Sequence, residues 1–288
     1  MAKLHFLLDG DGVLWRGAAL VPGAAEFLEF LRAQGHTYCL VTNNSALRRE
    51  DTAKRVAGMG LPFKPEQIFN TNYLAACYLN KHHAGTSVLV IGSDMLLDVL
   101  KSHGLRPYTA KDLLPADIGG SLTIKPFMRE SLALEPDIVL VGLDTGVDYN
   151  SIALACRLLH DGAKFIATNR DYTYPLEHGY LLPGNGAWVE LLEKVTGVEP
   201  INLGKPETHL VELVEREMGV ERAQMVMVGD RFETDIEMAQ RAGIRSVLVL
   251  TGVTSEIPKC WPEDSPPNVA VRDLAELQER FDSFFGGG

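Results

Sequence analysis

The segment Phe6-Leu7-Leu8-Asp9-Gly10-Asp11-Gly12 joins a short apolar run to two acidic residues separated by glycine. A continuously apolar run of this length is typical of a strand buried on both faces of a parallel sheet. Similar runs recur along the chain, each followed by glycine or polar residues. We therefore expect strands over residues 4–8, 38–41, 88–91, 138–141, 165–167, 225–228 and 246–250.

Helical patterns lie between several of these runs. Apolar residues recur at helical spacing over 22–35 and 206–219, and each segment begins with proline and ends with glycine. A third helix is expected over 234–243, with Thr234 as its N-cap. Strands that alternate with helices predict an α/β fold with a Rossmann-like, mostly parallel sheet.

The chain is long enough for more than one domain. Its 288 residues correspond to roughly two domains of about 150 residues. The middle of the chain has its own strand and helix alternation, flanked by loops at 82–86 and 182–186 that contain Gly and Pro. We expect one domain built from residues 1–79 and 185–288, with a second α/β domain, residues 80–184, inserted into it.

The amino-acid composition disfavours two classes of partner, nucleic acids and membranes. Asp and Glu number 38 against 27 Lys and Arg, which gives a net charge of −11 and disfavours binding to nucleic acid. No apolar stretch approaches the length needed to cross a bilayer, so no membrane contact is expected. The sequence shows no signal peptide, and its cysteines never form C-x-x-C, which together favour a reducing, cytoplasmic location. These cysteines are Cys39, Cys77, Cys156 and Cys260.

Polar residues follow four short apolar segments, which end at Leu8, Val41, Leu203 and Val228. In open parallel sheets, ligands bind at the carboxyl ends of the strands. If these strands are neighbours, their polar residues converge on one site, and Asp235, five residues after Asp230, can reach back to it. The converging residues are Asp9, Asp11, Thr42, Lys205 and Asp230.

The residue types at this site indicate phosphate chemistry. Carboxylates gathered in a small volume repel one another, and a hard divalent cation, Mg²⁺ rather than zinc, relieves that repulsion. Lys205, Thr42 and the amides around Asn43 offer a positive half-site for a phosphoryl group. Asp9 can then act as nucleophile and form an aspartyl-phosphate, while Asp11 carries a proton as acid and base.

The ordered motifs resemble those of the haloacid dehalogenase superfamily, in its phosphatase branch. They are Asp9-Gly10-Asp11-Gly12-Val13-Leu14, Thr42 after a strand, Gly204-Lys205-Pro206, and Gly229-Asp230 followed by Asp235. The resemblance implies that Asp9, the main-chain carbonyl of Asp11, and Asp230 bind Mg²⁺, and that Asp235 orients a metal-bound water or Lys205. It also implies that four residues hold the phosphoryl oxygens: Thr42, Asn43, Asn44 and Lys205.

Three further segments are similar to the NagD-like, p-nitrophenyl phosphatase subgroup: 41–45, 167–171 and 183–186. Members of that subgroup carry an α/β cap of the second type between the second and third motifs. Thr42 and Lys205 are 163 positions apart, which leaves room for one. By this resemblance Asn169 and Asp171 contact the substrate's leaving group, although the same residues also suit a plain turn after a strand. The resemblance leaves open a homodimer formed through the cap.

The function expected from these residues is hydrolysis of small phosphorylated metabolites. The alternatives are a phosphotransferase or phosphomutase on the same core, and a non-catalytic regulatory binding protein, which an intact catalytic set disfavours. The acidic pair Asp230 and Asp235 disfavours a metal-free dehalogenase. Sugar phosphates, nucleoside monophosphates, phosphoglycolate and pyridoxal phosphate all stay open as substrates. For Trp15, next to the nucleophile loop, the sequence leaves two alternatives: a residue at the entrance of the site or a buried aromatic.

Overall fold

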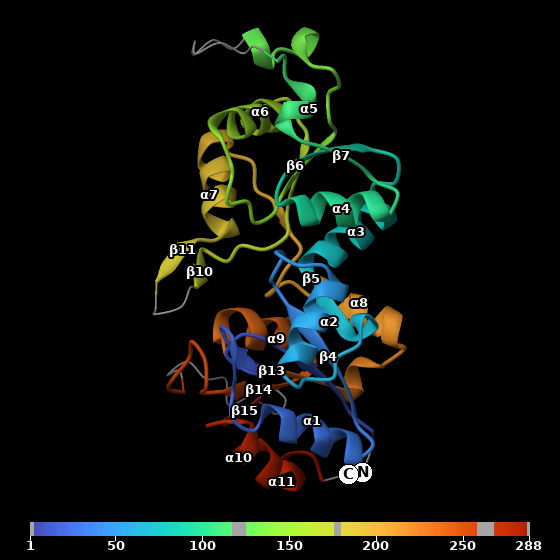
Figure 1. Cartoon of the computed structure of the whole chain (residues 1–288), viewed down its shortest axis with the longest axis vertical. Helices are drawn as coiled ribbons and strands as arrows, with labels where there is room; N and C mark the ends of the chain where they lie inside the picture. The colour runs from blue at the N-terminus through green and yellow to red at the C-terminus, as the bar shows by residue number, and fades with distance from the viewer. Residues whose placement is uncertain (1–2, 117–124, 176–179, 258–267, 287–288) are drawn as a thin grey trace. The chain divides into compact units, whose positions relative to one another are not determined.

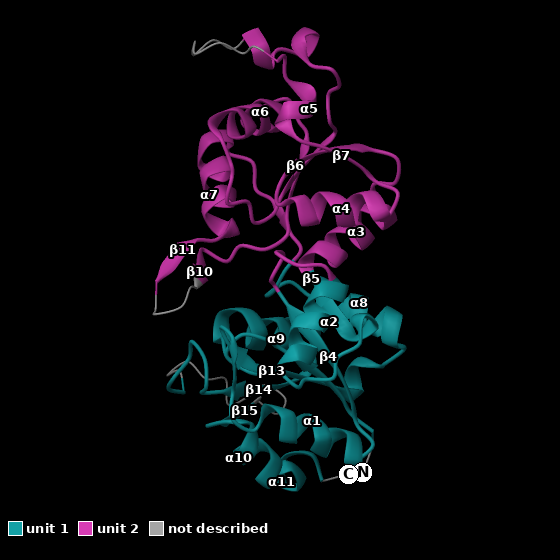
Figure 2. Cartoon of the chain, in the orientation of Figure 1, with its two compact units in different colours: residues 1–42, 49–70, 204–288 teal, residues 43–48, 71–203 magenta. Residues whose placement is uncertain are grey.

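Two parallel β-sheets organise the computed structural model, which describes residues 3–116, 125–175, 180–257 and 268–286 (Figure 1). Each sheet belongs to one of two compact units (Figure 2). Unit 1 comprises residues 1–42, 49–70 and 204–288, and unit 2 comprises residues 43–48 and 71–203. The α/β fold class expected from the sequence is confirmed.

The sheet of unit 1 has the strand order β15-β14-β13-β1-β4-β5, with every neighbouring pair parallel. Chain order runs outward from the centre of this sheet in both directions, so the topological switch point lies between β1 and β13. Both of these central strands are fully buried. The strands are β1 (His5–Leu8), β4 (Thr37–Thr42), β5 (Ile68–Asn70), β13 (Met225–Gly229), β14 (Arg245–Val249) and β15 (Asn268–Val271).

Helices of unit 1 pack their apolar faces on this sheet. In α1 (Ala24–Ala33), Phe27, Leu28 and Leu31 are buried, as their helical spacing predicts. The α8 helix (His209–Met218) ends at Gly219, in the left-handed conformation that glycine adopts readily. The other helices are α2 (Arg49–Gly58), α9 (Glu237–Ala242), α10 (Leu274–Glu279) and α11 (Phe281–Phe285), with 3₁₀ turns at Pro65–Gln67 and Arg222–Gln224.

The predicted cap at Thr234 is wrong. Thr234 lies inside a π-helical turn, Phe232–Ile236, that precedes α9, and the N-cap position belongs to Arg231. The main-chain N–H of Arg231 donates to the Asp235 carboxylate. The Asp235 side chain therefore accepts a hydrogen bond at the start of this turn, where the sequence analysis expected the Thr234 hydroxyl to do so.

The sheet of unit 2 has the order β12-β9-β8-β6-β7 and is also parallel throughout. Its core is a cluster of buried aliphatic and aromatic side chains that includes Leu89, Val139 and Phe165. The strands are β6 (Ser87–Ile91), β7 (Arg106–Tyr108), β8 (Ile138–Val141), β9 (Lys164–Ala167) and β12 (Ile201–Asn202). The helices are α3 (Thr71–His82), α4 (Asp94–Ser102), α5 (Ala110–Leu113), α6 (Tyr149–His160) and α7 (Asn185–Thr196), with 3₁₀ turns at Lys125–Phe127 and Arg129–Ser131.

Two antiparallel ribbons complete the described elements. In unit 1, β2 (Trp15–Arg16) pairs with β3 (Ala19–Leu20) shortly after the acidic segment that contains Asp9 and Asp11. In unit 2, β10 (Thr173–Pro175) pairs with β11 (Leu181–Pro183). The sequence analysis predicts neither ribbon.

The boundaries of the compact units differ from the expected domain boundaries. The chain passes from unit 1 to unit 2 between residues 70 and 71 and returns between 203 and 204, whereas the expected changes were at 79/80 and 184/185. The difference arises because α3 packs against α4 and α7 packs against α6, which places both helices in unit 2. Residues 43–48, directly after β4, also belong to unit 2.

None of the helices in the described ranges is both long enough and apolar enough to span a membrane. Cys39, Cys77 and Cys156 are free thiols, and Cys260 lies outside the described residues.

Candidate active site

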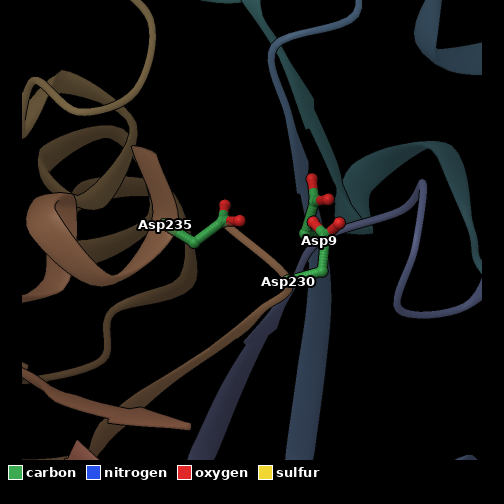
Figure 3. A group of neighbouring side chains, drawn as sticks. All are labelled: Asp9, Asp230 and Asp235. Carbon is green, nitrogen blue, oxygen red and sulfur yellow. The ribbon is translucent and has the colours of Figure 1, made fainter. Parts of the chain in front are cut away.

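Three buried carboxylates meet at the switch point of the unit 1 sheet (Figure 3). Asp9 directly follows β1, Asp230 directly follows β13, and Asp235 comes from the π-helical turn after them. One carboxylate oxygen from each residue lies within 4.8 Å of the other two. The parallel pairing of β1 with β13 brings the first two together, because it places Leu8 opposite Val228 and so aligns the ends of the two strands.

Burial and mutual repulsion perturb these carboxylates. Burial raises the pKa of Asp9 well above its usual value, and the neighbouring Asp235 and Asp230 raise it further, while Lys205 opposes the change. Burial, followed by repulsion from Asp235, raises the pKa of Asp230 to about 6. The protein therefore confines negative charge where water cannot solvate it, which is an arrangement that a cation would relieve.

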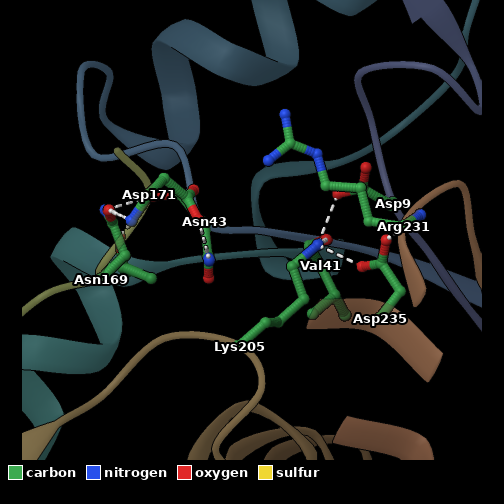
Figure 4. A network of polar contacts seen from close by, with 9 residues as sticks. Asp9, Val41, Asn43, Asn169, Asp171, Lys205, Arg231 and Asp235 are labelled. Atoms are coloured by element: carbon green, nitrogen blue, oxygen red, sulfur yellow. Dashed lines mark hydrogen bonds and ion pairs between the residues drawn. The ribbon is translucent and has the colours of Figure 1, made fainter. Parts of the chain in front are cut away.

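Lys205 supplies a positive charge to the same place (Figure 4). Its Nζ donates to Asp9 Oδ1 at 2.6 Å, to Asp235 Oδ1 at 2.7 Å and to the Val41 carbonyl at 3.4 Å. Burial alone would lower the pKa of Lys205, but the two carboxylates outweigh it and hold that pKa above its usual value. The ammonium group therefore stays charged and is fixed between the two aspartates.

Glycines give Asp230 and Asp235 the room they occupy. A Cβ on Gly12 or Gly252 would overlap the Asp230 carboxylate, and a Cβ on Gly229 would overlap the side chain of Asp235. The main-chain N–H of Val253 donates to Asp230 Oδ2 at 2.6 Å. The sequence analysis missed Gly252 and Val253, and the available signal was that they follow β14, a neighbour of β13 in the sheet.

The donor set fits a hard divalent cation. Among the described residues, the cluster that could hold a metal consists of carboxylates alone, without His or Cys. Buried carboxylate oxygens of this kind suit Mg²⁺ and disfavour zinc. The Asp11 side chain is not part of this cluster, so only its main chain is left to contribute in the way that the resemblance implies.

Asp11 and Thr42 lie beside the carboxylate cluster. Asp11 is exposed, but desolvation by the surrounding protein atoms still raises the pKa of its carboxyl group, against the opposing charge of Arg55. A raised pKa suits a group that must give up a proton near neutral pH. Thr42 is the last residue of β4, which pairs with β1, and it is buried.

The remaining four predicted residues belong to unit 2, where three of them bond to one another (Figure 4). Asn169 Nδ2 donates to the Asn43 carbonyl at 2.9 Å, and Asn43 Nδ2 donates to Asp171 Oδ1 at 3.2 Å. Asn44 Oδ1 accepts from the Ala46 N–H at 2.8 Å. Asn185, which the sequence analysis did not name, donates to the Asn169 carbonyl at 2.7 Å and so fixes the loop after β9. The structure therefore brings Asn43, Asn169 and Asp171 together as one network.

Comparison with known proteins agrees with this geometry. A family model described as haloacid dehalogenase-like hydrolase matches residues 6–106, and a second, HAD-hydrolase-like model matches residues 202–277. The chain is 33% identical to the 5'-nucleotidase YutF of Bacillus subtilis, over 94% of this chain and 96% of that protein. It is 31% identical to the acid sugar phosphatase of Staphylococcus epidermidis, over 95% of this chain and 98% of that protein.

A solved structure shares the fold over nearly its whole length. The 4-nitrophenylphosphatase from Thermotoga maritima superposes with a TM-score of 0.79 and 28% identity, over 96% of this chain and 97% of the other. The two family models match separate segments, one containing Asp9 and Thr42 and the other containing Lys205 and Asp230. The chain belongs to the haloacid dehalogenase-like hydrolases, in the phosphatase branch that holds the NagD-like proteins and the p-nitrophenyl phosphatases.

Proposed function

We propose that this protein is a Mg²⁺-dependent phosphatase that hydrolyses small-molecule phosphate monoesters through an aspartyl-phosphate at Asp9. The observation that carries the proposal is the contact of Lys205 Nζ with Asp9 Oδ1 at 2.6 Å, inside a buried carboxylate cluster that includes Asp230. Phosphoryl transfer requires a nucleophile and positive charge around the transferred group, and an acidic nucleophile beside a cationic side chain and a carboxylate metal site meets both requirements. The phosphatase names of the relatives support the same activity.

Asp9 and Asp230 would hold Mg²⁺ together with the main-chain carbonyl of Asp11. Bound there, Mg²⁺ would supply positive charge that offsets the negative charge of the phosphoryl group. Asp235 has a different role, because its Oδ1 accepts from Lys205 and its Oδ2 accepts from the Arg231 N–H. With both oxygens bonded to the protein, Asp235 orients Lys205.

In the proposed reaction, a carboxylate oxygen of Asp9 attacks phosphorus, and the bond from phosphorus to the ester oxygen breaks as the new bond forms. Asp11 gives its proton to the departing oxygen, which leaves as an alcohol. Asp11 then accepts a proton from water as that water attacks the phosphorus of the acyl phosphate. The products are inorganic phosphate and the restored Asp9 carboxylate. Thr42 and Lys205 bind the non-bridging oxygens throughout.

The nucleophile is tested with p-nitrophenyl phosphate. We expect Asp9→Asn to lower kcat by at least about 10³-fold, because an amide cannot form the acyl phosphate. The matched control is Asp51→Asn, which changes a half-exposed carboxylate on α2 and should keep full activity. Acid-quenched wild-type enzyme should carry a phosphoryl group on the peptide that contains Asp9. Full activity in Asp9→Asn, or activity that EDTA does not reduce, would refute the proposal.

Water is the proposed acceptor of the phosphoryl group. Release of p-nitrophenol and of inorganic phosphate should therefore stay equal when a sugar or glycerol is added. A shortfall of phosphate that grows with the added alcohol would establish a phosphotransferase instead.

Substrate choice is proposed to depend on the network of Asn43, Asn169 and Asp171 in unit 2. Asp171 accepts a hydrogen bond from Asn43, and its carboxylate is the charged group of this network. We expect Asp171→Asn to change KM by different factors for a sugar phosphate and a nucleoside monophosphate, with kcat for p-nitrophenyl phosphate nearly unchanged. An identical change for both substrates would contradict this role.

A further inference from the structure

Trp15 is a buried residue of the nucleophile loop for which the proposed mechanism has no use. It is 2% exposed, so the structure supports a buried aromatic over a residue at the entrance. Its main-chain N–H donates to the Gly10 carbonyl at 3.1 Å, and its own carbonyl accepts from the Gly12 N–H at 2.7 Å. The loop after β1 therefore folds back on itself and returns Trp15 to the side of Asp11, with which it forms a β-bridge.

The indole ring of Trp15 lies across the main chain between the two acidic residues of the loop. A Cβ on Gly10 would overlap the six-membered part of this ring, so only glycine permits the approach. The indole Nε1–H is buried and has no hydrogen-bond acceptor among the described residues. A buried donor without an acceptor costs free energy, so an acceptor that reaches it during the reaction is favoured.

The Asp11 carboxyl group is the acceptor placed to do this. Asp11 forms a main-chain bridge with Trp15, and its carboxyl group lies close enough to the Arg55 guanidinium and the Trp15 side chain for both to oppose the rise in its pKa, although no hydrogen bond of normal geometry joins the Asp11 and Trp15 side chains. Arg55 also fixes the indole, because its Cζ lies 5.2 Å from the centre of the Trp15 ring while its Nη2 donates to the Gly17 carbonyl at 2.7 Å. The exposed Asp11 side chain is thus flanked by a rigid ring and a tethered cation.

We propose that Trp15 is a positioning residue for Asp11: the indole N–H binds one carboxyl oxygen while the other oxygen delivers the proton to the leaving group. A protonated carboxyl group has one oxygen that accepts and one O–H that donates, so a fixed donor on the first oxygen sets the direction of the second. This role rests on the proposed function, because it requires Asp11 to act as general acid.

The test compares two leaving groups in the full-length enzyme. p-Nitrophenolate leaves readily without a proton, whereas the alkoxide of glycerol 2-phosphate needs one. We expect Trp15→Phe, which keeps an aromatic ring but lacks the N–H, to lower kcat/KM for glycerol 2-phosphate roughly tenfold and that for p-nitrophenyl phosphate less than about twofold. Trp188→Phe is the matched control, since it removes an indole N–H that bonds to the Asp144 carbonyl in unit 2. An equal loss on both esters would mean a merely structural role and overturn the proposal.

Two further measurements keep the test decisive. In an Asp11→Asn background, Trp15→Phe should add no further loss on glycerol 2-phosphate, because both changes remove the same proton delivery. If Trp15→Phe does not fold, incorporation of 3-benzothienylalanine at position 15 keeps the ring shape and replaces the N–H with sulfur, and the same discrimination between esters is expected. Additive losses in the double variant would show that Trp15 does not act through Asp11. That result would overturn the proposal for Trp15 and leave the proposed function intact. Wild-type enzyme inactive on both esters would instead remove the proposed function.

Discussion

At the scale of single residues, the positions of the acidic side chains depend on neighbouring glycines. Asp230 reaches the carboxylate cluster because Gly12 and Gly252 leave space for its carboxylate and the Val253 N–H binds one of its oxygens. Gly12 additionally has a φ of 86°, a backbone conformation that residues with a Cβ rarely adopt. In our proposal the acidic residues supply the reactive and metal-binding groups, and the glycines leave the space that those side chains occupy.

Gly252→Ala tests this dependence. The new methyl group would overlap the Asp230 carboxylate, so we expect weaker Mg²⁺ binding and activity that falls roughly tenfold at low Mg²⁺ but recovers at high Mg²⁺. The control is Gly58→Ala, at the end of α2, where a Cβ would meet open space. A titration of activity against Mg²⁺ distinguishes the two. An unchanged half-saturating Mg²⁺ concentration in Gly252→Ala would show that Asp230 tolerates the displacement.

The same scale explains which site residues the sequence could predict. Asp9 and Asp230 are predictable because each follows an apolar strand, and parallel strands bring their carboxyl ends to one edge. The space beside Gly252 and the burial of Trp15 are not predictable in this way, since they depend on atomic packing between segments that no periodic pattern records. The partners of Asn43 belong to the same class, because Asn169 and Asp171 follow a different strand in a different sheet.

At the scale of elements, the predicted strands are all present, and those missed have a common position. The missed strands of the two parallel sheets are β5, β15, β7 and β12, and each is an edge strand of its sheet. An edge strand has a neighbour on one side only and is often short, so its sequence need not be continuously apolar. The central strands must be apolar on both faces, which is why a sequence pattern reveals them.

One central strand contains a buried histidine, and this gives a prediction about pH. His5, at the start of β1, is 1% exposed, and its Nδ1 lies 2.8 Å from Thr37 Oγ1. Burial, followed by the charge of Lys3, lowers the pKa of His5 to about 4. The unfolded chain takes up a proton on His5 near pH 6.5, while the folded protein does so only near pH 4. The free energy of unfolding should therefore fall by about 3 kcal/mol from this group as the pH drops from 6.5 to 4.

Urea unfolding of wild type and His5→Gln across pH 4–7 isolates this contribution. Glutamine does not titrate, so the difference in unfolding free energy between the two proteins should shrink as the pH falls, while shared effects such as those of His36 cancel. A difference that is independent of pH would show that His5 does not carry the linkage.

At the scale of the whole molecule, the charges that bind Mg²⁺ in our proposal all belong to unit 1. Asp9 and Asp230 lie there, as does the Asp11 main chain, and none of them is in unit 2. A ligand that binds only the folded form stabilises it by about 2.7 kcal/mol at one hundred times its dissociation constant. We therefore expect Mg²⁺ to slow amide hydrogen exchange in β1 and β13 and to leave β6 and β8 nearly unchanged. Asp230→Asn should abolish the effect, and equal slowing in both sheets would contradict it.

The pairing of β1 with β13 also has a consequence for synthesis of the protein. Their partners His5 and Met225 are 225 − 5 = 220 positions apart, and all of unit 2 is translated between them. The hydrophobic β1 strand therefore leaves the ribosome long before β13 has been synthesised. Until then, the main-chain groups of β1 that later pair with β13 have no partner in that strand. A nascent or truncated chain that stops before residue 225 contains Asp9 but lacks Asp230 and Asp235, so premature termination products should be both inactive and prone to aggregation.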